Sequence, residues 1–274
     1  MPTDLSTSGS DFLILALLVI AATLAGLPLL ARLVHAIAPV DEGGAVNWSW
    51  RELALVLLLA VVWPFPLMTF VTVLHPWSAE LRVLVLSSLA LGLPAVAACV
   101  IASRQGPGGI GALGIRAGFL LRAPLAGVLL YALTFPALGA VMLLWQAVLR
   151  SWGTAELEQD VIRYLADMPS DQRFAALLLG AYVQPLFEEI LFRGFLQPVL
   201  VRWARPLGGI VLTSIVFASL HGLAAGVPVF ALSCVLGYVM LKTRRLHAVW
   251  AIHALHNGLQ FFFLYAAPDT FRPH

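Results

Sequence analysis

Three charged side chains stand inside a long apolar stretch of this sequence, where a charge needs a physical reason. Glu188, Glu189 and Arg193 all lie within the run 174–197. A charged side chain at the centre of a bilayer costs about 2.5–3.5 kcal/mol on insertion scales. On a helix, Glu189 and Arg193 share a face at four-residue spacing, so they can neutralise each other. Glu188 lies about 100° around the helix from Glu189, which leaves it free to act as a general base or acid.

Two later apolar stretches carry further polar side chains at helical spacing. Phe217 and His221 are four residues apart in one, and His253 and Asn257 are four residues apart in the last. Residues four apart project from the same face of a helix. His256 borders the face of His253 and could substitute for it in some role. Peptide hydrolysis needs a water nucleophile, a group that takes its proton and donors for the oxyanion, and these residue types supply them.

Each of these signals has a structural explanation when it is taken alone. A single intramembrane histidine is more often a hydrogen-bonding partner between helices than a catalyst, and a Glu–Arg pair is as readily a packing contact. Chains of buried Glu and His residues also build the proton relays of transporters. The three sets taken together are different from any one of them, because polar groups paired at helical spacing on three nearby helices are hard to explain by packing.

The elements that must position these residues are membrane helices. Of the 274 residues, 61% are hydrophobic and 11% are charged, whereas soluble domains have about 45–50% apolar and about 25% charged residues. The apolar runs are continuous rather than alternating, which favours helices over a barrel. We expect an all-α integral membrane protein of about eight transmembrane helices. The expected spans are 12–34, 53–74, 80–103, 119–149, 174–197, 207–225, 227–241 and 247–267.

The charges of the connecting loops predict an orientation in the membrane. Arg and Lys follow the odd-numbered spans, and with eight spans all these loops fall on one side, opposite the acidic stretch 150–172. The positive-inside rule then places both termini outside and the loops 104–118, 198–206 and 242–246 in the cytoplasm. We expect a multi-pass protein of the cell membrane, either a plasma or an inner membrane. No basic patch with interleaved aromatic residues is present, so nucleic acid is not an expected partner.

The polar motifs, taken together and in order, resemble a known signature. The set resembles the three motifs of the CAAX protease and bacteriocin-processing family, the type II CAAX prenyl endopeptidases and their prokaryotic relatives. The resemblance covers roughly residues 174–260 and makes 173–267 the expected catalytic core, after a motif-free region 1–172 and before a tail 268–274. The three motifs are Glu188-Glu189-x-x-x-Arg193, Phe217-x-x-x-His221 and His253-x-x-x-Asn257.

The resemblance implies a role for each motif position. Glu188 would activate water, and His221 would assist it as base partner or metal ligand. His253 and Asn257 would stabilise the oxyanion or complete a metal site. The supporting pair, Glu189 and Arg193, would hold the geometry.

Metal dependence stays open at this point. The family is commonly classed as metal-dependent, and His221, His253 and Glu188 have the side-chain types that bind zinc. The sequence has no HExxH motif, and a glutamate-activated water without a tightly bound metal is equally compatible with these residues.

The expected function is therefore that of an intramembrane endopeptidase, and the family resemblance implies a metalloprotease. Its partners would be the lipid bilayer and a membrane-anchored protein or peptide substrate, which need not be prenylated. Two alternatives remain. One is a proton-coupled transporter, which an inverted repeat would favour, although the sequence shows no such symmetry. The other is a non-catalytic membrane scaffold descended from the protease.

Overall fold

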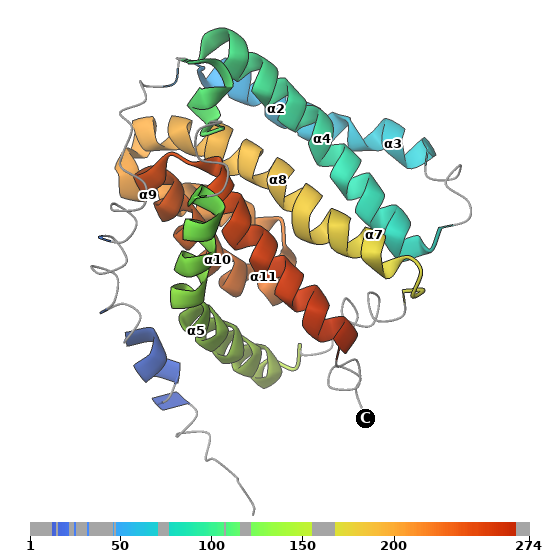
Figure 1. Cartoon of the computed structure of the whole chain (residues 1–274), viewed down its shortest axis with the longest axis vertical. Helices are drawn as coiled ribbons and strands as arrows, with labels where there is room; N and C mark the ends of the chain where they lie inside the picture. Colours follow the sequence, from blue (N-terminus) through green and yellow to red (C-terminus); the bar gives the residue numbers. More distant parts are fainter. Residues whose placement is uncertain are drawn as a thin grey trace, which may run out of the picture.

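The computed structural model describes residues 48–70, 77–106, 108–115, 122–154 and 168–266, together with 13, 14, 16–21, 25, 32 and 46. Every regular element in this part of the chain is helical (Figure 1). The predicted span 12–34 and the predicted tail 268–274 lie largely or wholly outside these residues. The elements are α2 (Trp50–Val62), α3 (Pro64–Phe70), α4 (Ala79–Gln105), η2 (Gly109–Leu113), α5 (Arg122–Ser151), α7 (Arg173–Leu177), η4 (Leu178–Val183), α8 (Gln184–Glu189), η5 (Ile190–Leu196), α9 (Gln197–Ser219), α10 (Gly222–Thr243) and α11 (Leu246–Ala266).

The class of all-α integral membrane protein is confirmed, but the count of eight spans is not. Within the described residues, five helical segments are long and apolar enough to cross a membrane: Trp50–Thr69, Ala79–Gln105, Pro124–Ser151, Arg173–Ser219 and Gly222–Thr243. The fourth of these has 47 residues, far more than the roughly 20 that one crossing needs.

This long segment turns back on itself at Arg205. The backbone leaves helical geometry there, with φ at 63° and ψ at 171°. Beyond the turn, a Cβ atom built on Gly209 would lie 2.6 Å from the Cα of Val201. Only a glycine allows the two backbones to approach so closely, so the turn is packed tightly and the chain changes direction there.

The predicted boundary between the next two helices is wrong. The expected span 207–225 ends at Ser219, and α10 begins at Gly222, whose φ of 73° suits a glycine. The chain has no break between the expected spans 207–225 and 227–241, because Gly226 and Pro228 both lie inside α10. Apolar composition continues across the true and the expected boundary alike, so hydropathy could not separate them. The correction places His221 at the junction between two helices.

The helix that leads into α9 changes its winding on both sides of the two glutamates. The segments η4 and η5 are π-helical and flank α8. Pro185, near the start of α8, cannot donate the backbone hydrogen bond of a regular turn, and such a residue is a common cause of a local irregularity. π-Helical turns occur frequently at functional sites, and this pair brackets the stretch that carries Glu188 and Glu189.

Close backbone contacts hold the other helices around this one. A Cβ atom on Gly127 of α5 would lie 2.4 Å from the carbonyl oxygen of Ala248, so α5 and α11 nearly touch. Small residues at such contacts are typical of helix packing in membranes. Ahead of α2, the Trp48 indole donates to the Phe195 carbonyl at 3.0 Å and stacks on its ring at 5.0 Å. Since α4 packs against both α2 and α8, this N-terminal half covers one side of the helix that carries the glutamates.

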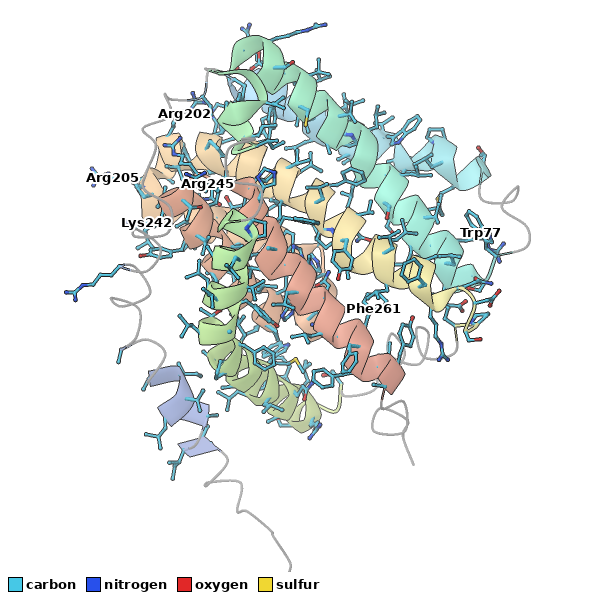
Figure 2. The ribbon with its side chains drawn as sticks, in the orientation of Figure 1. Trp77, Arg202, Arg205, Lys242, Arg245 and Phe261 are labelled. Atoms are coloured by element: carbon cyan, nitrogen blue, oxygen red, sulfur yellow. The ribbon has the colours of Figure 1, made fainter. Side chains whose placement is uncertain are left out.

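Basic side chains gather at one end of the bundle. Arg202, Arg205, Lys242 and Arg245 lie close together in Figure 2, where Trp77 marks a distant end. This arrangement agrees with the predicted same-side placement of the loops 198–206 and 242–246. The orientation of that side towards the cytoplasm stays a prediction.

Candidate active site

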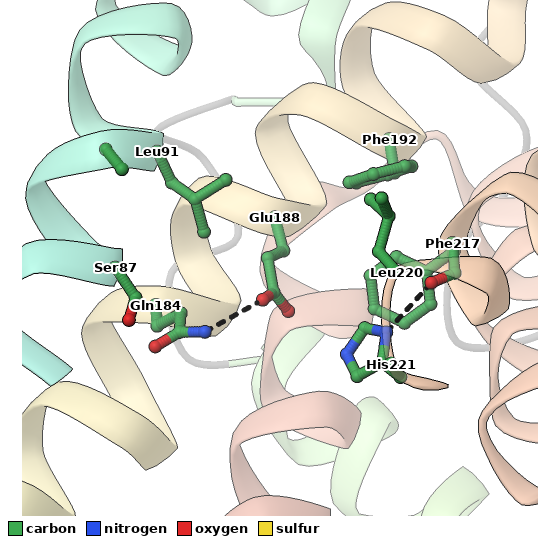
Figure 3. A pocket seen from close by; sticks show the side chains of 9 residues that line it. Ser87, Leu91, Gln184, Glu188, Phe192, Phe217, Leu220 and His221 are labelled. Carbon is green, nitrogen blue, oxygen red and sulfur yellow. Dashed lines mark hydrogen bonds between the residues drawn. The ribbon is translucent and has the colours of Figure 1, made fainter. Parts of the chain in front are cut away.

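A cavity of about 310 Å³ lies between α4, α8 and the junction of α9 with α10 (Figure 3). Four polar side chains line it, namely Ser87, Gln184, Glu188 and His221. The rest of its lining is apolar: Ala90, Leu91, Phe192, Phe217 and Leu220. The cavity therefore joins a carboxylate and an imidazole within mostly apolar walls, as substrate sites commonly do.

Glu188 is held at this cavity by contacts on each carboxylate oxygen. The residue is only 7% exposed. Its Oε1 accepts a hydrogen bond from Nε2 of Gln184 at 3.2 Å. Its Oε2 lies 3.6 Å from Nε2 of His253, which comes from α11. At this distance the two groups make no direct hydrogen bond.

Glu189 points to the other side of the His253 ring, into a buried network. Its Oε1 accepts from Nη1 of Arg193 at 3.2 Å and from Nδ1 of His253 at 2.7 Å. Arg193 donates its second amino group to Oγ of Ser233 at 2.9 Å, and its guanidinium carbon lies 4.3 Å from the ring centroid of Phe217. Glu189 and Arg193 thus pair as predicted. Full burial of these two charges requires such pairing, because an isolated buried ion is strongly destabilising.

The hydrogen bonds of the two histidines select their tautomers. Since a carboxylate accepts, His253 donates from Nδ1 to Glu189, and its Nε2 is turned towards Glu188. Likewise the carbonyl oxygen of Phe217 accepts from Nδ1 of His221 at 2.8 Å, which leaves Nε2 of His221 with a lone pair. In both residues, one nitrogen is fixed by the protein and the other is available for chemistry.

Asn257 does not line the cavity. Its Nδ2 donates to the carbonyl oxygen of Gly180 in η4, at 3.1 Å. His256 belongs to a different cluster from His253, with Nδ1 3.0 Å from the Tyr131 hydroxyl and Nε2 2.8 Å from the amide nitrogen of Gln260. The structure therefore brings Glu188 to His253, places His221 on the same cavity, and sets Asn257 and His256 apart from it.

The residues proposed as zinc ligands do not gather as a metal site. Among the described residues, no three His, Cys, Asp or Glu side chains lie close enough together to hold a metal ion. Glu188 and His253 form a close pair, with the third ligand missing. Zinc binding by His221, His253 and Glu188 stays a prediction.

The segment that carries these motifs matches a known family. Residues 170–259 match the family described as type II CAAX prenyl endopeptidase Rce1-like. We refer to residues 170–259 below as the Rce1-like domain, after this similarity. No curated protein and no solved structure matches the chain.

The cavity is completed from outside the Rce1-like domain. Ser87, Ala90 and Leu91 of α4 form the wall that faces α8, and α4 precedes the matched residues by more than one helix. The sequence carried no signal for this wall, because α4 reads only as an apolar span. It also gave no reason to single out Ser233, whose hydroxyl accepts from Arg193. Gln184 was overlooked although its signal was present: it is a polar residue in an apolar span, one helical turn before Glu188.

Proposed function

We propose that the protein is an intramembrane endopeptidase that hydrolyses a peptide bond in a membrane-anchored protein or peptide. The observation that carries the proposal is the geometry around Glu188. Its carboxylate lines a largely apolar cavity together with His221, and it lies 3.6 Å from a histidine nitrogen that is turned towards it. Glu188, His221 and His253 all lie within the Rce1-like domain. The family that this segment matches is described as an endopeptidase.

Glu188 activates the attacking water. A water molecule about 2.8 Å from both Oε2 of Glu188 and Nε2 of His253 fits at the apex of a triangle on their 3.6 Å separation. Glu188 takes a proton from this water as the oxygen attacks the substrate carbonyl, and it then delivers the proton to the leaving amine. His221 assists from the same cavity, where its Nε2 accepts a hydrogen bond from the water or from the leaving group.

His253 stabilises the oxyanion that forms in this attack. In its protonated state it donates from Nε2, and the carboxylate of Glu189 on its Nδ1 stabilises the positive charge. Arg193 holds Glu189 in place through their 3.2 Å ion pair. Asn257 assists from outside the cavity, because its hydrogen bond to Gly180 fixes the π-helical segment that leads into α8.

The walls of the cavity favour an apolar substrate segment. Apart from its four polar side chains, the cavity presents aliphatic and aromatic groups from three helices. A substrate anchored in the bilayer, by a lipid or by its own apolar tail, can reach such a site without leaving the membrane. Prenylation is one such anchor and is not required by any group that lines the cavity.

The test is cleavage of anchored peptides by purified protein in lipid vesicles. Wild type is compared with Glu188→Gln on a panel of lipid-anchored and membrane-spanning peptides, and new termini are identified by mass spectrometry. We expect cleavage that Glu188→Gln abolishes. Glu52→Gln is the matched control, because Glu52 caps the start of α2 with Ser49 and does not line the cavity. Since a panel can miss the true substrate, the termini of all membrane proteins are compared in cells that carry either variant.

A contrary result would be proton-coupled flux that depends on Glu188, with no new terminus in either assay. That outcome would assign the carboxylate to transport instead of hydrolysis.

A further inference from the structure

Gln184 contacts the central carboxylate but belongs to none of the three motifs. It is the first residue of α8, and its side chain lines the cavity beside Glu188. Figure 3 shows its amide nitrogen directed at the Glu188 carboxylate, and the distance from Nε2 to Oε1 is 3.2 Å. The two residues are four apart, so one helical face presents both.

The chemistry of the contact fixes which way the amide points. A carboxylate oxygen accepts hydrogen bonds and cannot donate them when ionised. If the amide were flipped, its oxygen would face the carboxylate oxygen of Glu188 and the two would repel. Therefore Nε2 of Gln184 faces Glu188, and Oε1 of Gln184 points elsewhere. That Oε1 is buried and has no hydrogen-bond partner among the described residues.

We propose that Gln184 positions the base and receives the substrate. Its N–H holds Glu188, and its Oε1 accepts a hydrogen bond from a backbone N–H of the bound peptide. The hydrogen bond to the peptide rests on the proposed function. The positioning of Glu188 concerns the protein alone. Gln184 is a positioning residue towards Glu188 and a binding residue towards the peptide.

The positioning role follows from the contacts of the two carboxylate oxygens of Glu188. With Oε1 of Glu188 held by Gln184, the other oxygen is directed towards His253 at 3.6 Å. Without that hydrogen bond, the carboxylate can rotate about its terminal bond, whose torsional preference is broad. The oxygen that takes the proton from water would then be misplaced for part of the time, which lowers the rate of the chemical step.

The contact with the peptide follows from the lack of water in the bilayer around the site. A peptide must be extended to be cleaved, and its backbone N–H groups then lack helical partners. In a bilayer these groups find no water, and each unsatisfied group costs several kcal/mol. Gln184 lines the cavity, and its Oε1 is a buried acceptor with no partner within the described protein, so a small shift of the amide as the peptide binds lets it meet this need.

The chain supplies a matched control on the same continuous helix. Gln197 is also a buried glutamine that donates from Nε2, in this case to the carbonyl oxygen of Gly237 at 2.9 Å. Its Oε1 likewise has no partner among the described residues, yet Gln197 does not line the cavity. Gln184→Met and Gln197→Met remove the same polar atoms and keep the length of the side chain. Only the first should affect Glu188.

The first experiment needs no substrate. The carboxylate infrared band of Glu188 is isolated as the difference between wild type and Glu188→Gln, in the full-length protein in lipid. We expect this band to shift in frequency in Gln184→Met, because the carboxylate loses a hydrogen bond, and to stay in place in Gln197→Met. An unshifted band in a folded Gln184→Met protein would overturn the positioning role.

The second experiment uses whichever anchored peptide the wild type cleaves in the vesicle panel. We expect Gln184→Met to lower kcat about 10- to 100-fold, as for the loss of a hydrogen bond to a charged group. We also expect a rise in KM of about fivefold, as for the loss of a neutral hydrogen bond. Gln197→Met should change the yield of folded protein while its kcat and KM stay near wild type.

The outcomes separate the proposals. A Gln184→Met protein with wild-type kcat would refute positioning, and one with wild-type KM would refute the contact with the peptide. If the wild type cleaves no peptide of the panel and membrane-protein termini in cells do not depend on Glu188, the proposed function fails, and the infrared band still decides whether Gln184 holds Glu188.

Discussion

Arg193 is the residue at which the energetics of the site can be measured most directly. Its side chain is fully buried. It forms an ion pair of 3.2 Å with Glu189 and a hydrogen bond of 2.9 Å to Ser233, and its guanidinium carbon lies 4.3 Å from the centroid of the Phe217 ring. We predict the effect of Arg193→Met, which keeps the bulk of the side chain and removes its charge and its donors.

The size of the stability loss follows from the Glu189 carboxylate, which stays buried without its partner. Removal of one partner of a buried ion pair costs about 3–5 kcal/mol, because the other charge remains uncompensated. The loss of the cation–π contact adds about 0.5–2 kcal/mol. One contact offsets this loss, because Glu189 keeps its 2.7 Å hydrogen bond from His253. We therefore expect a loss of about 3–5 kcal/mol in the free energy of unfolding.

The assay is denaturant unfolding in detergent micelles, with Arg150→Met as the matched control. Arg150 is an exposed arginine in the last turn of α5, and its substitution should change stability by less than about 0.5 kcal/mol. The double variant Glu189→Gln with Arg193→Met removes both charges at once. It should be more stable than Arg193→Met alone, since no buried charge is stranded.

The result that would refute this reasoning is additivity. If the double variant loses the sum of the two single losses, Glu189 and Arg193 do not stabilise each other in the folded protein. A stability of Arg193→Met equal to that of Arg150→Met would have the same consequence.

Two further predictions concern the turn in the long helix and the catalytic unit. Gly209→Ala should destabilise the protein by about 1–3 kcal/mol, because the new Cβ would lie 2.6 Å from backbone atoms across the turn. In Gly226→Ala the new Cβ meets no atom within 4 Å, so this change should stabilise α10 by about 0.5–1 kcal/mol. Thermal unfolding of both variants checks this pair, and equal midpoints would contradict it. Glu188→Ala and His253→Ala should each abolish peptide cleavage, and the double variant should be little worse, because residues that act on one water are not additive. Rate losses that multiply in the double variant would show that the two side chains act independently.

The sequence by itself determined the features that depend on one helix at a time. Composition and the continuity of the apolar runs are sufficient for the all-α membrane class, because the bilayer leaves a chain few other ways to satisfy its backbone. The pairing of Glu189 with Arg193 was also predictable, since a four-residue spacing places both on one face of any helix. The ordered motifs pointed to roughly residues 174–260, and residues 170–259 match the Rce1-like family.

Only the tertiary structure decided which faces of different helices meet. Periodicity defines a face within a helix but does not tell which neighbour it contacts, so the 3.6 Å approach of His253 to Glu188 and the α4 wall of the cavity were hidden. Asn257 shows the same limit, because its helical spacing from His253 is correct and its amide nevertheless bonds to Gly180. The junction at His221 was misplaced for a related reason: apolar side chains suit the bilayer on both sides of a helix break, and the break itself is a backbone event that hydropathy does not record.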